Sequence, residues 1–377
     1  MLSKFRVQRY KSLFDTEIEL DPLTVLIGPN GSGKSNICES LFMLSDFLEK
    51  LLNDKSTDSA ILPLFLMSLK TQYNQDLNFF QPKLWHGEFK HLLFEISNSG
   101  QMEYDAEIKL SIYLDLVDLF STASITLGSV EKTQNMNYKK TNELKNFMVT
   151  NDFFDSSLAN ALKKVFIYDF IPKDLSTKTS SSERMDRTGK GITNSLVDIL
   201  HENRESFVEL EERLTRLVPN IKRISLPRGD DQGFVLELID KYSGYRIDSS
   251  EISDGTLKIL GFLTAIYQKD TPSIICFEEL ENGVHPWLLH KLVELLQIVS
   301  TEGINGKPVQ VLITTHSPLL LNYVKPEQIR AVELDKEGKT QVHKLPTDSV
   351  RFQKALEAYD NDLGELWFTN IFGGNPQ

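Results

Sequence analysis

The strongest constraint on the fold is a glycine-rich stretch at residues 28–35, which reads Gly-Pro-Asn-Gly-Ser-Gly-Lys-Ser. It follows an apolar run at 23–27 and precedes a helical pattern that starts at Lys34. A strand, a loop of G-x-x-x-x-G-K-S spacing and a helix, in that order, are typical of a phosphate-binding loop. The glycines let backbone N–H groups turn inward, and the helix start adds a positive dipole end. We therefore expect Lys34 to contact the β- and γ-phosphates of a nucleotide and Ser35 to bind Mg²⁺.

Composition limits the kind of protein. The chain has 377 residues, of which 40% are apolar and 25% charged, as expected for a globular protein of two or three domains. Its net charge of -12 means that any DNA contact would need a local basic patch. No run approaches about 18 apolar residues, so we expect no membrane span. Cys38 and Cys276 lie in apolar runs and are interpreted as reduced core residues, which fits a cytoplasmic location.

Hydrophobic periodicity predicts alternating strands and helices. The polar segment 178–190 is interpreted as a solvated loop rather than a ligand-contacting one. We expect strands at 5–7, 16–20, 23–27, 91–96, 104–114, 165–168, 221–224, 234–238, 273–277 and 309–315, and helices from 34 and at 61–69, 156–164, 195–201, 205–217, from 257 and from 286.

Two carboxylates, Glu278 and Glu279, directly follow the buried strand at 273–277. Such a pair matches a Walker B pattern, in which Glu278 would hold the Mg²⁺ shell through water and Glu279 would polarise the attacking water. Paired acids can also be solvated strand ends. The glycine loop upstream favours the nucleotide role.

Two further stretches are ambiguous when each is taken alone. Ser253-Asp254-Gly255-Thr256 opens an apolar helix, where a hydroxyl and a dipole end suit a terminal phosphate, but an N-cap formed by Ser253 or Asp254 explains it as well. His316 ends the strand at 309–315, where either a structural histidine or a γ-phosphate sensor would stand. Because these stretches follow the glycine loop in this order, we favour the γ-phosphate sensor for His316.

In this order, the motifs Gly-Pro-Asn-Gly-Ser-Gly-Lys-Ser, Ser-Asp-Gly-Thr, Phe-Glu-Glu-x-Glu-Asn-Gly-x-His-Pro and Thr-Thr-His-Ser-Pro resemble the ABC-type ATPases of the RecF/SMC and OLD branch. The closest likeness is to the stand-alone AAA-type ATPases of that branch, which the stretches at 10–14 and 363–367 also resemble. The resemblance implies an α/β P-loop NTPase with an ABC-type head at 1–50 and 220–345. Residues 51–219 would then form an inserted lobe of strands and helices, and 346–377 a C-terminal helix and tail.

The resemblance also implies a shared site, in which two protomers trap two ATP molecules with Mg²⁺ between them. Asn282 and Gly283 match the loop that crosses this interface, whereas Asp254 departs from the usual Ser-Gly-Gly-Gln. No Q-loop glutamine can be assigned, and Gln81 and Gln101 are only guesses for it. The residues implied in catalysis are Glu279, His316 and Lys34, those implied in metal binding are Ser35 and Glu278, and those implied in nucleotide binding are Gly28, Pro29, Asn30, Gly31, Ser32, Gly33, Lys34, Ser35, Asn36, Ser253, Asp254 and Gly255.

Two roles remain open. The first is an ATP-gated homodimeric switch that acts on DNA in repair or in defence against phage. The second is a regulatory ATPase that controls a separate effector, such as a nuclease or toxin encoded nearby, without binding DNA itself. A transporter motor is disfavoured because the motifs match the RecF-like branch better. The stretch 317–377 is too short for a Toprim nuclease domain, and its acids Asp360, Asp362 and Glu365 indicate no more than a solvated helix end.

Overall fold

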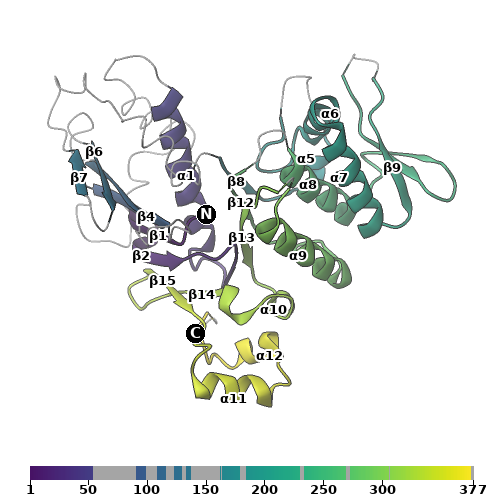
Figure 1. Cartoon of the computed structure of the whole chain (residues 1–377). Helices are drawn as coiled ribbons and strands as arrows, with labels where there is room; N and C mark the ends of the chain where they lie inside the picture. The colour runs from purple at the N-terminus through teal and green to yellow at the C-terminus, as the bar shows by residue number, and fades with distance from the viewer. Residues whose placement is uncertain are drawn as a thin grey trace. The chain divides into compact units, whose positions relative to one another are not determined.

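The computed structural model is drawn in Figure 1. It describes residues 1–53, 91–98, 108–115, 123–129, 133–136, 162, 164–178, 184–229, 233–268, 272–304 and 306–374. The chain divides into two compact units, Met1–Val165 with Lys325–Gln377, and Phe166–Val324. The division expected from the sequence follows other boundaries and stays a prediction.

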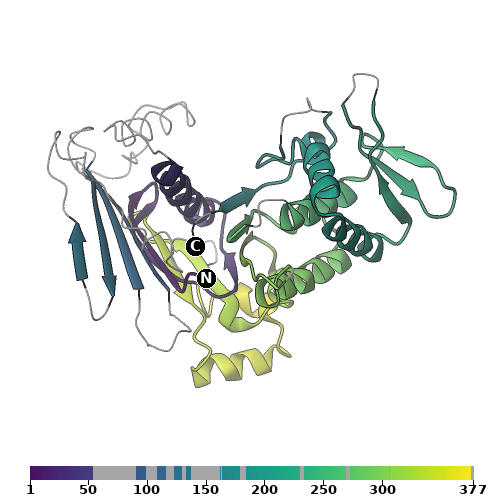
Figure 2. The same ribbon diagram turned by 45° about the horizontal axis from the view of Figure 1, so that its top comes forward.

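The first unit contains two groups of strands. One is a fully antiparallel sheet in the order β2-β1-β4-β5-β6-β7, whose strands lie side by side in Figure 2. In the other group, β14 pairs in parallel with β3 and antiparallel with β15. The bounds are β1 Lys4–Tyr10, β2 Leu13–Glu19, β3 Leu23–Ile27, β4 His91–Asn98, β5 Ile108–Asp115, β6 Ala123–Ser129, β7 Thr133–Met136, β14 Ile329–Leu334 and β15 Thr340–Lys344.

Strand β3 is the core strand of this unit. All five of its residues are buried, as is expected of a strand that is covered on both faces. Helix α1, Lys34–Asn53, follows it after the glycine loop. At the C-terminal end, α11 (Val350–Ala358) and α12 (Leu363–Phe368) lie together in Figure 1, and the side chain of Asp362 caps α12.

The second unit joins a parallel strand pair to a set of helices. Strands β12 (Ile274–Phe277) and β13 (Gln310–Thr315) pair in parallel and are buried throughout, and β8 (Val165–Tyr168) lies beside β12. Strands β9 (Ile221–Ser225), β10 (Glu237–Asp240) and β11 (Arg246–Asp248) form a separate antiparallel sheet next to α7 in Figure 1. The remaining elements are α5 Pro172–Leu175, α6 Ile192–Glu202, α7 Arg204–Leu217, α8 Asp254–Tyr267, α9 Pro286–Thr301, α10 Pro318–Leu321 and the short 3₁₀ helix Pro326–Gln328 that precedes β14 in the first unit.

The strand at 23–27, the strand at 165–168 and the helix start at Lys34 are confirmed. The strand expected at 234–238 is shifted to β10, because Phe234 and Val235 bond to an irregular stretch at Arg228 and Pro227 instead. Strands β6, β7 and β11 were not expected, and the strand expected from 104 is described only from Ile108. The helix expected at 61–69, and nearly all of the one at 156–164, lie outside the described residues.

Candidate functional site

The glycine loop turns tightly between β3 and α1. Gly31 and Gly33 have φ angles of +76° and +104°, which glycine adopts without the penalty of a side chain. A Cβ at Gly33 would lie 2.1 Å from Oγ1 of Thr340, and one at Gly28 would lie 2.0 Å from the carbonyl oxygen of Val332. Both positions therefore need glycine, because the backbone of the loop packs directly against β14 and β15.

A chain of side-chain hydrogen bonds supports the loop from behind. The hydroxyl of Thr340 donates to the carbonyl of Ser32 at 2.9 Å, so its bond to Ser12, at 2.7 Å, must be donated by the serine hydroxyl. The Asn36 amide in turn donates to Ser12 at 2.8 Å. The order Asn36, Ser12, Thr340, Ser32 joins helix α1, the turn after β1 and strand β15 to the loop. Asn36 thus acts here as a support of the loop.

Lys34 and Ser35 differ in exposure. The Lys34 ammonium is buried and donates to the carbonyls of Gly28, at 2.9 Å, and Pro29, at 2.8 Å, so it lies over the loop itself. Ser35 is exposed at the first turn of α1, together with Asn30 and Gly31 on the loop. The loop therefore offers a positive charge, a helix N-terminus and an accessible hydroxyl, the set that binds phosphate and Mg²⁺.

In the second unit, Glu278 directly follows strand β12 and carries a buried carboxylate. Its side chain is 5% exposed and its Oε2 accepts a hydrogen bond from the Arg187 guanidinium. The other oxygen, Oε1, is buried and has no hydrogen-bond partner within the described residues. A buried acceptor without a partner is costly, so Oε1 points to a ligand such as a metal-bound water.

Glu279 has a different environment. Its backbone adopts a left-handed conformation with φ of +45°, and its N–H donates to the Thr314 hydroxyl at 3.1 Å. The carboxylate is half-exposed, accepts from the Asn282 amide at 3.3 Å and lies 3.9 Å from Nε2 of His316. Strained backbone at a carboxylate that faces solvent is typical of a functional position. The structure thus brings together Glu279 and His316, and their catalytic roles stay a prediction.

The turn after Glu279 is held by two contacts that the sequence did not reveal. Glu281 accepts the backbone N–H of His316 at 2.7 Å, and the ammonium of Lys258, on α8, donates to the carbonyl of Asn282 at 2.7 Å. Burial lowers the pKa of Lys258, and the nearby carboxylates of Asp169 and Glu279 counter this in part. Lys258 therefore connects the helix that begins at Ser253 to the turn that carries Glu279.

Ser253 is the N-cap of α8, which confirms the interpretation of this stretch as a helix cap. Its hydroxyl accepts from the N–H of Thr256 at 3.3 Å and donates to the Thr256 hydroxyl at 2.8 Å. Ser253 and Asp254 are nevertheless exposed. The ligand role of Ser253, Asp254 and Gly255 stays a prediction.

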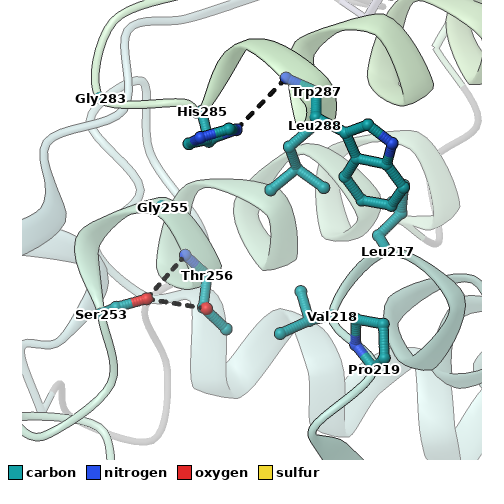
Figure 3. Close-up of a pocket in the computed structure, with 10 residues that line it drawn as sticks. All are labelled: Leu217, Val218, Pro219, Ser253, Gly255, Thr256, Gly283, His285, Trp287 and Leu288. Atoms are coloured by element: carbon teal, nitrogen blue, oxygen red, sulfur yellow. Dashed lines mark hydrogen bonds between the residues drawn. The ribbon is translucent and has the colours of Figure 1, made fainter.

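A pocket of about 290 Å³ opens beside this cap. Figure 3 shows Ser253 and Thr256 at the start of α8 on one side of it, and His285 and Trp287 at the start of α9 on the other. Gly283 also lines the pocket, and a Cβ at Gly255 would lie 3.3 Å from its carbonyl oxygen. Two helix N-termini thus face one opening, and positive dipole ends of this kind favour an anionic group.

The residues present fit a nucleotide-bound Mg²⁺. Taken separately, Ser35 of the first unit has an accessible hydroxyl, and Glu278 of the second unit has a carboxylate oxygen without a partner among the described residues. In the described part of the chain, no three His, Cys, Asp or Glu side chains gather into a site that could hold a metal alone. Nucleotide-bound Mg²⁺ is usually held through one or two protein groups and the phosphates.

Arg187 was missed because it lies in the segment interpreted as a solvated loop. Arg187 is exposed, as expected of such a loop, but its guanidinium also pairs with the buried carboxylate of Glu278. Lys258, Thr314, Glu281 and Thr340 were also missed. No local pattern marks them, since each acts through a partner that is distant in sequence.

A mixed α/β fold with mostly parallel core strands and a G-x-x-x-x-G-K-S loop defines the chain as a P-loop NTPase. A family model described as "AAA domain, putative AbiEii toxin, Type IV TA system" matches residues 87–322, more than half of the chain, and the chain belongs to this family. A second model, described as "AAA ATPase domain", matches residues 1–169. The protein is therefore an ATPase.

No functionally curated protein matches the sequence. Among the described residues, no helix is both long and apolar enough to cross a bilayer.

Proposed function

We propose that the chain is an ATP-driven switch in defence against phage, in which two copies close around two ATP molecules and separate after hydrolysis. The observation that carries this proposal is that one unit contains both a half-exposed Glu279 and an exposed helix start at Ser253. A group that acts on ATP and a second group suited to a terminal phosphate both face solvent, and this suits a site completed by another copy.

Each residue then has a chemical role. Lys34 neutralises the β- and γ-phosphates, and Ser35 and Glu278 hold Mg²⁺, which neutralises the charge that develops on the phosphates. Glu279 accepts a hydrogen bond from the attacking water, orients it and polarises it. His316, beside Glu279, donates to the γ-phosphate. Ser253 and the N–H groups at the start of α8 bind the γ-phosphate of the ATP held by the partner copy.

The role in defence rests on the family. The description of the matching model names an AbiEii toxin and a type IV toxin–antitoxin system, which favours defence over DNA repair. The net charge of -12 favours the alternative in which the switch controls a separate effector without binding DNA. Binding of duplex and single-stranded DNA over a series of salt concentrations, with and without ATP, separates the two. Salt-dependent binding that requires ATP supports action on DNA, whereas its absence supports an effector partner.

The dimer is tested with Glu279→Gln, which removes the group that polarises water but keeps its shape. This variant should bind ATP, hydrolyse it slowly and elute as a dimer in gel filtration with ATP and Mg²⁺. Adding Ser253→Arg should restore the monomer without loss of ATP binding, because the bulky side chain blocks only the partner's nucleotide. Glu302→Gln, an exposed position at the end of α9, is the control and should behave as wild type. A monomeric Glu279→Gln protein with bound ATP would contradict the shared site.

A further inference from the structure

The ion pair between Arg187 and Glu278 is the starting point. Its two partners are far apart in sequence and unequal in exposure, with side chains 42% and 5% exposed, respectively. The carboxylate is therefore the desolvated partner. A buried carboxylate oxygen needs a hydrogen-bonding partner to offset its lost hydration, and Arg187 supplies one to Oε2.

Arg187 is held in place by its loop. The carboxylate of Asp186 accepts from the backbone N–H groups of Thr188, at 2.8 Å, and Lys190, at 3.1 Å. The carbonyl of Arg187 accepts from the N–H of Asp169, directly after β8, at 2.9 Å. Gly189 packs so closely that a Cβ there would lie 2.4 Å from Leu175. The guanidinium is therefore presented to Glu278 by a folded turn.

The second observation concerns the other carboxylate oxygen. Arg187 contacts Oε2, and Oε1 is buried with no hydrogen-bond partner among the described residues. One oxygen is thus fixed by a cation, while the other is left without a protein partner among the described residues. Carboxylates that hold metals are commonly oriented in this way by a hydrogen bond to the oxygen that does not face the metal.

We propose that Arg187 is a positioning residue of the nucleotide site, which holds the carboxylate of Glu278 turned so that Oε1 receives the hydration shell of Mg²⁺. This rests on the proposed role of Glu278 as the metal-holding carboxylate. In this proposal Arg187 contacts neither ATP nor metal, and its effect on the metal passes through Glu278. A purely structural ion pair would stabilise the fold without affecting the metal, and a competing cation would weaken metal binding.

The experiment measures Mg²⁺ binding without catalysis. The thermal unfolding midpoint is followed during an Mg²⁺ titration with an ATP analogue whose β–γ bridge cannot be hydrolysed, and the Mg²⁺ concentration for half of the shift is compared. Arg187→Gln should raise this concentration about 10- to 100-fold, the usual effect of losing a residue that orients a metal ligand. Arg187→Lys should raise it less, because it restores the charge. Arg184→Gln is the matched control, since Arg184 lies in the same loop, its side chain is 60% exposed and it pairs with Asp198 at 3.8 Å rather than with Glu278.

The outcomes separate this inference from the proposed function. If the analogue with Mg²⁺ does not shift the wild-type midpoint at all, the proposed nucleotide site fails. If wild type responds but Arg187→Gln needs the same Mg²⁺ or less, the positioning role is overturned and the pair is structural or competing. If Arg187→Gln does not fold, Arg187→Lys decides in the same way. Its half-shift concentration must lie severalfold above wild type, because an ammonium lacks the fixed geometry of the guanidinium.

Discussion

Thr340→Val tests whether strand β15 sets the shape of the glycine loop. Valine keeps the volume of threonine but has a methyl group in place of the hydroxyl that donates to Ser32 and accepts from Ser12. Thr340 is 1% exposed, so the carbonyl of Ser32 would have no water to replace its lost donor. The Ser12 hydroxyl is partly exposed and can turn to solvent.

The cost is therefore that of one buried acceptor without a partner, about 1–3 kcal/mol. If this free-energy cost falls on the nucleotide-binding form of the loop, the ATP dissociation constant should be about tenfold higher than that of wild type. Isothermal titration calorimetry with ATP and Mg²⁺ measures it, with Thr340→Ser as the control that keeps the hydroxyl. The reasoning is refuted if the valine variant binds ATP within twofold of wild type, or if serine and valine weaken binding equally.

Two further substitutions test the contacts around the site. Gly33→Ala should abolish ATP binding in the same calorimetric assay, because its Cβ would lie 2.1 Å from the Thr340 hydroxyl. The control Gly31→Ala also has a positive φ but nothing within 4 Å of its Cβ, so it should weaken binding only modestly. Equal effects of the two substitutions would contradict the clash at Gly33. Lys258→Met keeps the buried stem but loses the bond to the Asn282 carbonyl, so steady-state kinetics should show kcat about tenfold lower, with the ATP dissociation constant unchanged. A change in affinity without a change in kcat would show that Lys258 supports binding instead.

Local sequence predicted the parts of the structure that local physics determines. The strand at 23–27 and the helix start at Lys34 follow from a buried apolar run, a glycine loop and helical spacing, all within 20 residues. The N-cap at Ser253 follows from its side chain alone. Strand β11 has only three residues, too few for a period-two pattern to stand out.

The contacts that shape the site could not be predicted from local sequence, because their partners lie far apart in the chain. Arg187 reaches a carboxylate 91 positions away, and Thr340 reaches a carbonyl 308 positions away. Each looks like an ordinary polar surface residue in the sequence, since nothing nearby in the chain marks its partner. Folding brings these pairs together through the packing of whole strands, which periodicity predicts only as the presence of a strand.

The link from Lys258 to Asn282 has a consequence for the timing of hydrolysis in the proposed dimer. The helix that begins at Ser253 would sense whether the partner's ATP is intact, and the turn beyond Glu279 would act on the protomer's own ATP. The Lys258 ammonium connects the two, so loss of one γ-phosphate would loosen the catalytic turn that serves the other. The two ATP molecules would then be hydrolysed one after the other, and the first hydrolysis would delay the second.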